Sequence, residues 1–561
     1  MLNLFRDAVG KARDAVREAP DRVRVGARLS QQTGMLWALT RPGLSELLRT
    51  LASGSQNPAS LYRINAKNCP SKPAMIWRGR VTSWAELDER IDRIASGLMR
   101  RGIKRGKSIL LMMRNRQELV ELGASVARAG GAAVSVSWRS TPKELAYLAN
   151  HSGALGIAIE ADLLPILDQA RSELGAEFLE NVLVVGGEAP KGTTHLDDLL
   201  EQPATKVVTS KEDEENAAVV VYTSGTTGKP KGAVRKYPKD TMQAAFRFIN
   251  ETPMRVDDVH LVACPLYHST AFGFMVLSQI LGATTVLMDH FDAEEFLRLV
   301  DRYEVATTAV VPTMLQRLLD VAPEVRAKYD TRSLRAVFVG GAPLPGPVAT
   351  EFMDAFGDVL YQFYGATETG LVTLAKPQDL RAASTTIGKI VPGNEIRLLD
   401  DEGRQVEQGQ VGELYVKNKM LVAGYHRDED ATSQSMRDGF FSVGDLARID
   451  RDGRYFIEGR KRDMIISGGV NVYPAEVEGV LEQHPDIAEV AVVGVPDREW
   501  GEKVRAFVVV RSGRTRDEGS LKTYARDRLS GPKVPRDFVF LDALPRNPTG
   551  KILKRELRER S

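Results

Sequence analysis

Residues Val219 to Gly232 read VVVYTSGTTGKPKG, an apolar run that passes directly into a loop of hydroxyls, glycines and lysines. The three valines predict a strand that is covered on both faces, as in a parallel sheet between helices. Glycines in such a loop let backbone N–H groups close on an anion, while hydroxyls and lysines add donors and positive charge. The loop is not a Walker A loop, because Pro230 follows Lys229 and no glycine stands five residues before Gly228. The sequence therefore predicts an anion-binding loop at the end of a buried strand.

Strands and helices alternate on both sides of this loop. Strands are predicted at 108–113, 132–136, 217–222, 307–311 and 336–339, and helices at 117–128 and 293–304. Two strands joined through one helix form a βαβ unit, and such units build a parallel sheet. The middle of the chain is therefore predicted to be α/β.

The pattern changes after residue 390. Short strands at 395–399, 412–417, 447–450 and 455–458 are separated by turns that contain glycine, and Asp452-Gly453 is a hairpin signal. Beyond Gly459 a helix at 475–483, strands at 487–493 and 505–510, a helix at 519–529 and a strand at 537–540 predict a compact α+β unit. The predicted fold class is α/β, with a large N-terminal domain of stacked α/β subdomains, a small β-barrel-like subdomain and a small α+β C-terminal domain.

The composition is that of a soluble globular protein with more than one core. The chain has 561 residues, of which 43% are hydrophobic and 27% are charged. With 76 Lys and Arg against 74 Asp and Glu, the net charge of +2 gives no electrostatic footprint for nucleic acid. Two cysteines cannot form a disulfide framework and indicate a reducing compartment, so a cytoplasmic location is predicted. The seven histidines show no metal-ligand spacing.

Two segments raise the question of membrane contact. Near the N-terminus apolar residues recur at helical spacing, at Leu2, Phe5, Val9, Ala12 and Val16. Because basic residues occupy the other side, the pattern predicts an amphipathic helix that packs on the body or a partner, or attaches reversibly to a membrane surface. Residues 261–288 carry no Lys, Arg, Asp or Glu, but Pro265 and a turn at Gly282 favour a buried helix and strand over a membrane span.

The loop at Tyr222–Gly232 resembles the signature phosphate loop of the adenylate-forming superfamily of acyl-CoA synthetases, peptide-synthetase adenylation domains and luciferases. Further motifs resemble that family in order and spacing: PLYH at 265–268, GGAP at 340–343, YGATETG at 364–370, Gly444-Asp445, GRKRD at 459–463, SGGVNVYP at 467–474 and PRNPTGK at 545–551. The resemblance covers residues 57 to 557 and is greatest to bacterial fatty-acid–CoA ligases. It implies an N-terminal extension at 1–50, a large adenylation domain at 51–459, a hinge at 460–463 and a small mobile C-terminal domain at 464–561.

The resemblance also implies an ATP site assembled from several motifs. The residues implied to bind ATP are Thr223, Ser224, Gly225, Thr226, Thr227, Gly228, Lys231, Gly340, Gly341, Ala342, Pro343, Tyr364, Gly365, Asp445 and Arg460. Tyr364 would stack on adenine, Asp445 would accept hydrogen bonds from the ribose hydroxyls, and Arg460 would contact the ribose region. The backbone at 340–342 would approach the purine and the acyl group.

The implied catalytic residues are Lys551, Glu368, Thr367 and His268. Lys551 would offset the charge that develops between the carboxylate and the α-phosphate. Thr367 would contact that phosphate, and Glu368 would bind Mg²⁺, which prefers carboxylate and phosphate oxygens. His268 would gate the path from the acyl pocket to the nucleotide.

Coenzyme A is implied to enter after the C-terminal domain rotates about Arg462. The family usually has Lys or Asp at this hinge position, so the arginine is a departure. Gly468 and Gly469 would line the thiol's tunnel, where a Cβ would obstruct the path, and Trp500 would contact coenzyme A.

The function implied is an ATP-dependent acid–CoA ligase, with Mg²⁺ as cofactor and ATP and CoA as cosubstrates. The acid is predicted to be a medium- or long-chain fatty acid. Two alternatives stay open, namely an aromatic or steroid-like carboxylate and an acyl-adenylate that is delivered to a carrier protein. A non-catalytic nucleotide- or lipid-binding relative is disfavoured, because the phosphate loop, Glu368, Asp445 and Lys551 all match the family pattern. A homodimer and a peripheral membrane position are not decided by the sequence.

Overall fold

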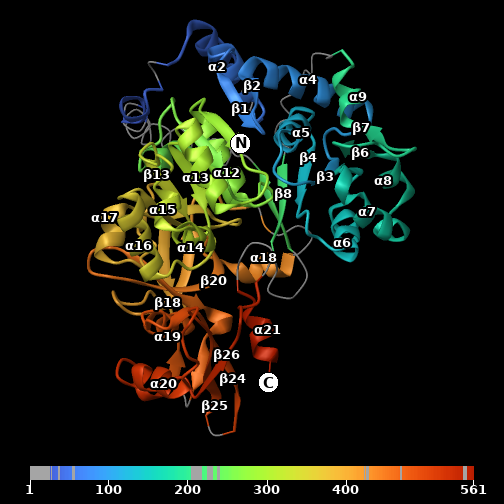
Figure 1. The fold of residues 1–561 in the computed structure, drawn as a ribbon. Helices are drawn as coiled ribbons and strands as arrows, with labels where there is room; N and C mark the ends of the chain where they lie inside the picture. Colours follow the sequence, from blue (N-terminus) through green and yellow to red (C-terminus); the bar gives the residue numbers. More distant parts are fainter. Residues whose placement is uncertain are drawn as a thin grey trace, which may run out of the picture.

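The computed structural model describes residues 26, 28–35, 38–53, 57–203, 218–223, 231–236, 241–422, 424, 429–467, 470–498, 500–546 and 552–560. They form two large sheets flanked by helices, a smaller antiparallel sheet and a C-terminal unit with its own sheet. In Figure 1 the C-terminal unit, coloured orange to red, lies at the end of the molecule opposite the blue N-terminal helices. The chain is therefore a mixed α/β protein with a large N-terminal and a small C-terminal domain, as predicted.

The first sheet contains the strand that leads into the anion-binding loop. Its strands are β3 (Ser108–Met112), β4 (Ala132–Val136), β5 (Gly156–Glu160), β6 (Val182–Val185), β7 (Thr194–His195), β8 (Ala218–Thr223) and β9 (Lys231–Lys236). They lie in the order β7-β6-β5-β3-β4-β8-β9, and every neighbouring pair is parallel except β8 and β9. Every residue of β3 and β6 is buried, as expected for strands with helices on both faces.

The helices of this half are α4 (Trp84–Arg100), α5 (Gln117–Arg128), α6 (Pro142–Ser152), α7 (Leu164–Ala170), α8 (Ala176–Glu180) and α9 (Leu196–Leu200). The sequence fixes the ends of α6 clearly. Thr141 and Glu144 form a capping box at its start, and Gly153 ends it with a φ of 63°.

The second sheet has nine strands and a parallel centre. Its strands are β1 (Pro73–Trp77), β2 (Arg80–Ser83), β10 (Val259–Val262), β11 (Thr284–Leu287), β12 (Thr307–Val310), β13 (Ala336–Val339), β14 (Leu360–Ala366), β15 (Gly370–Ala375) and β16 (Lys389–Ile390). The order is β16-β15-β14-β13-β12-β10-β11-β1-β2, with β14 through β1 parallel. The carboxyl ends of β10, β12, β13 and β14 therefore meet at one edge, where ligands bind in sheets of this kind.

The helices around this sheet are α11 (Thr241–Ile249), α12 (Ser269–Ile280), α13 (Ala293–Tyr303), α14 (Pro312–Asp320), α15 (Pro323–Arg326), α16 (Gly346–Phe356) and α17 (Pro377–Ala382). Of these, α12 is apolar all round, which is typical of a buried helix. It is followed by the buried strand β11, so the uncharged residues 261–288 form a helix and strand inside the protein, as predicted. Within the part of the chain that the structure describes, no helix has the length and hydropathy needed to span a bilayer.

The third and fourth sheets occupy the last third of the chain. The third is antiparallel and consists of β17 (Glu395–Leu399), β18 (Gly412–Lys417), β19 (Met436–Arg437), β20 (Phe440–Ile449) and β21 (Tyr455–Arg460), with α18 (Glu429–Ser435) beside it. The C-terminal unit contains β22 (Ile465–Ser467), β23 (Val470–Val472), α19 (Pro474–Leu481), β24 (Ile487–Asp497), β25 (Gly501–Val510), α20 (Glu518–Arg526), β26 (Asp537–Phe540) and α21 (Lys554–Glu559). A short 3₁₀ turn, Lys461–Asp463, joins the two units.

Several strands are longer than predicted, among them β24, β25 and β20. The sequence predicts a strand at 447–450, whereas β20 starts at Phe440. The added residues pair with β18, with Phe441 opposite Val416, and both Phe440 and Phe441 are buried. Gly444 interrupts the apolar pattern with a φ of 78°, which is why the sequence did not indicate one continuous strand.

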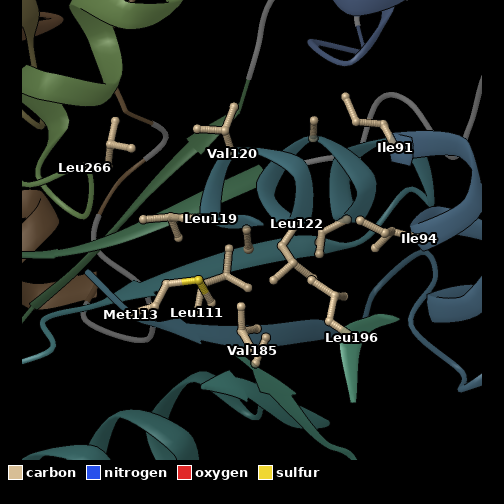
Figure 2. Close-up of a cluster of buried hydrophobic side chains, with 14 of the residues drawn as sticks. Ile91, Ile94, Leu111, Met113, Leu119, Val120, Leu122, Val185, Leu196 and Leu266 are labelled. Carbon is tan, nitrogen blue, oxygen red and sulfur yellow. The ribbon is translucent and has the colours of Figure 1, made fainter. Parts of the chain in front are cut away.

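A buried cluster joins α5 to the second sheet (Figure 2). It contains Leu119 and Leu122 from α5, Leu111 from β3, and Leu266 from the loop after β10. Burial of one such leucine contributes about 1.5–3 kcal/mol. The loop that carries the PLYH motif is therefore anchored on α5.

The N-terminal residues pack on the same body. Leu29 is only 4% exposed and shares a cluster with Phe248 of α11 and Phe274 of α12. Further on, α2 (Arg41–Ser53) packs against α3 (Ser60–Asn68). The amphipathic helix predicted near residues 2–16 lies outside the described residues.

Candidate active site

The phosphate loop is the tip of a β-hairpin. Strands β8 and β9 pair in antiparallel register, with Thr223 opposite Lys231. The residues between them include Ser224, Gly225, Thr226, Thr227 and Gly228, and they lie outside the described residues. The hairpin emerges at the carboxyl end of β8, as the sequence predicts, and this edge is where parallel sheets bind ligands.

The PLYH loop is held by a residue that the sequence analysis did not identify. Asn115, which follows β3 and is 4% exposed, donates from Nδ2 to the carbonyl oxygens of Cys264 at 2.9 Å and Met288 at 3.0 Å. Its Oδ1 accepts from the N–H of Leu266 at 2.7 Å. One amide therefore fixes the loop to both large sheets. The signal that could have found it is an asparagine close behind a mostly apolar strand, two residues after the predicted strand at 108–113.

His268 lies at the N-terminus of α12, with its ring 4.1 Å from that of Tyr267 between centroids. Its Nε2 is buried and has no hydrogen-bond partner among the described residues. Burial lowers the pKa of His268 to about 4, so the ring is neutral near pH 7. A neutral ring without a fixed hydrogen bond at Nε2 suits a gate better than a proton carrier.

The motif YGATETG forms the hairpin between β14 and β15. Thr367 Oγ1 lies 3.3 Å from the hydroxyl of Ser269, the first residue of α12. Glu368 is 7% exposed, and its carbonyl oxygen accepts from the N–H of Val422 at 2.9 Å. Asn418 donates to the carbonyl oxygen of Thr369 at 2.8 Å. The hairpin thus brings Thr367 and Glu368 to the N-terminus of α12, close to the PLYH loop.

The GGAP motif follows β13, and its two glycines are needed for different physical reasons. A Cβ on Gly340 would lie 2.6 Å from the ring of Phe363, so this glycine is required for packing. Gly341 lines the cavity described below and has a φ of 80°, which other residues rarely adopt. Close backbone approach to a ligand is therefore supported at Gly341, whereas Gly340, Ala342 and Pro343 do not line the cavity.

Tyr364, Asp445 and Arg460 meet in one cluster. The Tyr364 hydroxyl donates to Asp445 Oδ2 at 2.7 Å, and Arg460 Nε lies 3.0 Å from Asp445 Oδ1. Strands β20 and β21 place the last two residues directly opposite each other. Burial and the Asp445 carboxylate hold the pKa of Tyr364 well above its usual value, so the hydroxyl stays a donor. A carboxylate has about four lone-pair sites, so Asp445 can still accept bonds from a ligand.

One large cavity of about 2010 Å³ is lined by His268, Gly341, Gly365, Thr367, Glu368 and Arg460, whereas Tyr364 and Asp445 lie behind its lining. At one end it is lined by Thr367, Glu368 and Arg460, and from there it follows α12 from His268 to Leu281. At its other end it is lined by residues of the N-terminal segment, among them Leu29 and Met35. The cavity can therefore hold a polar ligand at one end and a long apolar ligand along the helix.

The C-terminal domain contributes Arg546 to the same cavity. Its Nη2 donates to Glu489 at 2.9 Å, which fixes the start of the PRNPTGK motif beside the site. Lys551, five residues further on, lies outside the described residues. The described orientation of the domain thus brings this motif toward the cavity.

Of the residues predicted to act in the second half-reaction, the structure describes Arg462 and Trp500. Arg462 lies in the 3₁₀ turn at 461–463, and Gly468 and Gly469 fall outside the described residues, between β22 and β23. Trp500 does not line the large cavity; the Arg536 guanidinium lies 4.7 Å from the centre of its ring. The described orientation therefore does not bring Trp500 to the adenylate end.

Glu368 offers a carboxylate to a metal at this site. No group of three or more His, Cys, Asp or Glu side chains in the described ranges could hold a metal ion. Glu368 is buried at the polar end of the cavity and provides one carboxylate. This fits Mg²⁺, which commonly binds through one or two carboxylates together with substrate phosphates.

Comparison with known proteins agrees with this geometry. The AMP-binding enzyme family matches residues 62–426, and the AMP-binding enzyme C-terminal domain matches residues 476–551. Fatty acid–[acyl-carrier-protein] ligase ScoC of Streptomyces coeruleorubidus is 32% identical over 504 residues, which cover 88% of this chain and 95% of ScoC. Medium/long-chain-fatty-acid–CoA ligase FadD8 of Mycobacterium tuberculosis is 31% identical over 515 residues, 88% of either chain. The structure of o-succinylbenzoate CoA synthetase MenE from Bacillus subtilis with its acyl-adenylate intermediate has a TM-score of 0.78 and 28% identity, covering 89% of this chain and 97% of MenE.

Proposed function

Because the chain belongs to the AMP-binding enzyme family and is thereby an adenylate-forming acid–thiol ligase, we propose that it joins a medium- or long-chain fatty acid to coenzyme A. The single observation that supports this acid is the cavity along α12, which continues from the polar site to the N-terminal segment. ATP supplies the free energy of the reaction.

The reaction has two half-reactions. In the first, a carboxylate oxygen of the acid attacks the α-phosphorus of ATP, the bond from that phosphorus to the β-phosphate oxygen breaks, and pyrophosphate leaves. In the second, the sulfur of coenzyme A attacks the acyl carbon, the bond from that carbon to the phosphate oxygen breaks, and AMP leaves. The thiol proton passes to solvent.

The proposed nucleotide site uses the cluster around Asp445. The free lone pairs of Asp445 accept hydrogen bonds from the ribose hydroxyls, and Tyr364 and Arg460 hold the carboxylate in position. The loop from Thr223 to Lys231 encloses the β- and γ-phosphates with backbone N–H groups and lysine charge. Glu368 would hold Mg²⁺, which when bound offsets the negative charge of the phosphates.

The first half-reaction brings two anions together, so positive charge is needed between them. We assign this role to Lys551, and the position of Arg546 at the cavity supports the assignment, because the two residues belong to one motif. Positioned charge of this kind is commonly the largest catalytic term. Thr367, beside Ser269, contacts the α-phosphate in the same step.

His268 separates the polar end of the cavity from the part along α12. Its neutral ring, packed against Tyr267, admits an apolar chain at no cost in buried charge. The carboxylate of a fatty acid would thus stay on the nucleotide side of His268, with the chain on the side of α12.

An oxygenated or aromatic acid is the second candidate substrate. Thr241 Oγ1 and Gln243 Nε2 of α11 are buried at the cavity and have no hydrogen-bond partner among the described residues. A buried donor without a partner is costly, so a polar group on the acid would be favoured there. Coenzyme A is proposed as acceptor because Gly468-Gly469 suits a thiol tunnel. ScoC is named as a ligase to an acyl-carrier protein, so a carrier protein is the alternative acceptor.

The test is pyrophosphate release by the purified protein with ATP and Mg²⁺. Saturated acids from C4 to C20, benzoate and a sterol acid are compared, each with and without coenzyme A. Turnover that requires coenzyme A and peaks at a chain length between C8 and C18 is expected. One equivalent of pyrophosphate that is released regardless of coenzyme A would instead indicate delivery to a carrier protein. Preference for benzoate or the sterol acid would overturn the fatty-acid assignment.

A further inference from the structure

At the end of α12 far from His268 the cavity is lined by residues that precede the family domain. The family match begins at residue 62, yet Leu29, Met35, Leu39 and Leu47 all line the cavity. Leu29 comes from the helical residues 28–33, Met35 from the turn after them, Leu39 from the residues just before α2, and Leu47 from α2. The shape of the cavity at this end is therefore specific to this N-terminal segment.

This segment is fixed to the body by several hydrogen bonds. The N–H of Val256 donates to the carbonyl oxygen of Thr33 at 3.1 Å. Asn68, at the end of α3, accepts from the N–H of Thr40 at 2.7 Å and donates to the carbonyl oxygen of Ala38 at 3.2 Å. Leu29 is 4% exposed within an apolar cluster. The segment is thus held against the body by hydrogen bonds and by apolar packing.

The segment is also tied to the far end of α12. Asn65 of α3 donates to the carbonyl oxygen of Gln279 at 2.8 Å, and the Tyr62 hydroxyl donates to Gln279 Oε1 at 3.0 Å. α3 therefore fixes the position of the N-terminal segment relative to α12. The distance from the gate to the segment is set by the length of that helix.

That length can be compared with an acyl chain. The 12 residues of α12 span about 18 Å at 1.5 Å per residue. An extended hydrocarbon chain advances about 1.3 Å per carbon, given C–C bonds of about 1.5 Å. The helix is thus as long as a chain of about 14 carbons.

We infer that residues 28–35, together with Ala38 and Leu39, are the end wall of the acyl site and that they set the upper limit of acyl-chain length near C14. This inference rests on the proposed fatty-acid ligase function. Met35 is the residue best placed to test it, because it is half-buried, lines the cavity and packs beside the cluster of Leu29.

The first experiment measures kcat/KM for saturated acids from C6 to C18 with the full-length enzyme. Met35→Trp should lower the value for C16 at least tenfold and leave C8 within twofold. Met35→Ala should raise C16 relative to C12 by about fourfold, the value of one methylene placed against an apolar wall. Leu48→Ala is the matched control, because Leu48 is 55% exposed on α2 and does not line the cavity. Equal loss at all chain lengths in Met35→Trp would overturn the inference.

The second experiment detects contact without turnover. Met35→Cys is placed in a Cys69→Ser background, since the other native cysteine, Cys264, is 3% exposed. Maleimide labelling is then followed with acyl-sulfamoyl adenosine analogues of C6 to C18 bound. Labelling should slow at least fivefold from about C12 upward and be unaffected by C6. Labelling that does not depend on chain length, in an enzyme that turns over fatty acids, would overturn the inference alone. Absence of turnover with every fatty acid would overturn the proposed function.

Discussion

Replacing Asn115 with alanine would remove a side chain that ties the PLYH loop to both large sheets. Its amide donates to the carbonyl oxygens of Cys264 and Met288 at 2.9 and 3.0 Å and accepts from the N–H of Leu266 at 2.7 Å. The side chain is buried, so water cannot replace these bonds freely in the native enzyme. The substitution thus tests whether the position of His268 is imposed from outside its own motif.

The expected magnitude follows from the groups left behind. Alanine leaves two carbonyl oxygens and one N–H without their partner, and each buried unpaired group costs about 1–3 kcal/mol. Water entering from the neighbouring cavity offsets part of this cost, so about 3–5 kcal/mol of local stability should be lost. A displacement of the loop by about 1 Å would lower the rate of acid activation about 10²-fold.

Two measurements together check this prediction. Hydrogen exchange of the peptide covering residues 263–268 should accelerate, and kcat/KM for the acid should fall while the KM for ATP changes little. The matched control is Asn181→Ala, whose amide makes one exposed hydrogen bond to the carbonyl oxygen of Glu177 at 3.1 Å. Unchanged exchange in this peptide, or an unchanged kcat/KM, would refute the positioning role of Asn115.

Three further predictions concern the nucleotide, a buried histidine and the two half-reactions. Asp445→Asn removes one charged acceptor from Tyr364 or Arg460 and should raise the KM for ATP about 10–100-fold in initial-rate assays, since such bonds contribute about 1.5–3 kcal/mol. His260, hydrogen-bonded to Thr307, has its pKa lowered to about 3 by burial, so only the unfolded state binds its proton near pH 5. Stability from this group is present above its unfolded pKa of about 6.5 and is lost below it. The free energy of unfolding should fall by about 2 kcal/mol between pH 7.5 and pH 5. Urea unfolding at these two pH values should show that His260→Asn lacks this decrease. Lys551→Ala should abolish adenylate formation but spare thioester formation from supplied acyl-adenylate, and Gly469→Leu should do the reverse; impairment of the same half-reaction by both would contradict a two-orientation mechanism.

The parallel strands could be predicted because their apolar composition indicates that they are buried. Runs such as 108–112 and 336–339 contain almost only apolar residues, and the structure buries every one of them. A strand that is covered on both faces contains mostly apolar side chains. Its first and last residues can therefore be identified in the sequence without knowledge of the neighbouring strands. The predicted bounds at 132–136 and 336–339 agree with β4 and β13.

The site could be predicted as a set of residues but not as a set of contacts. The motifs placed Tyr364, Asp445 and Arg460 in one nucleotide site, and they do meet within hydrogen-bonding distance. Asn115 was not predicted because its partners are backbone groups far along the chain. Nearly every residue carries the same backbone groups, so the sequence does not show which of them a side chain will bind. Gly340 was assigned to ligand approach, yet its neighbour is the ring of Phe363.

The position of the N-terminal segment at the cavity could not be predicted for a related reason. The apolar residues predicted to form an amphipathic helix, from Leu2 to Val16, indicate that one face is covered but do not say by what. In the structure α2 packs on α3, and described residues at 28–35 and 38–53 line the cavity. The helix α2 also continues past the boundary predicted at residue 50.

The proposed rotation about Arg462 has a consequence that follows from where β21 ends. Arg460 is the first residue of the predicted hinge 460–463 and is paired with Asp445 across two adjacent strands, so a rotation about Arg462 would leave this pairing intact. Asp463 follows Arg462 and is held by Arg558 of α21 at 2.6 Å, so it moves with the C-terminal domain. The adenylate must stay bound while the catalytic lysine leaves and the thiol enters, because it is the intermediate that the two steps share. A rotation about Arg462, two residues after Arg460, would therefore let one nucleotide site serve both half-reactions.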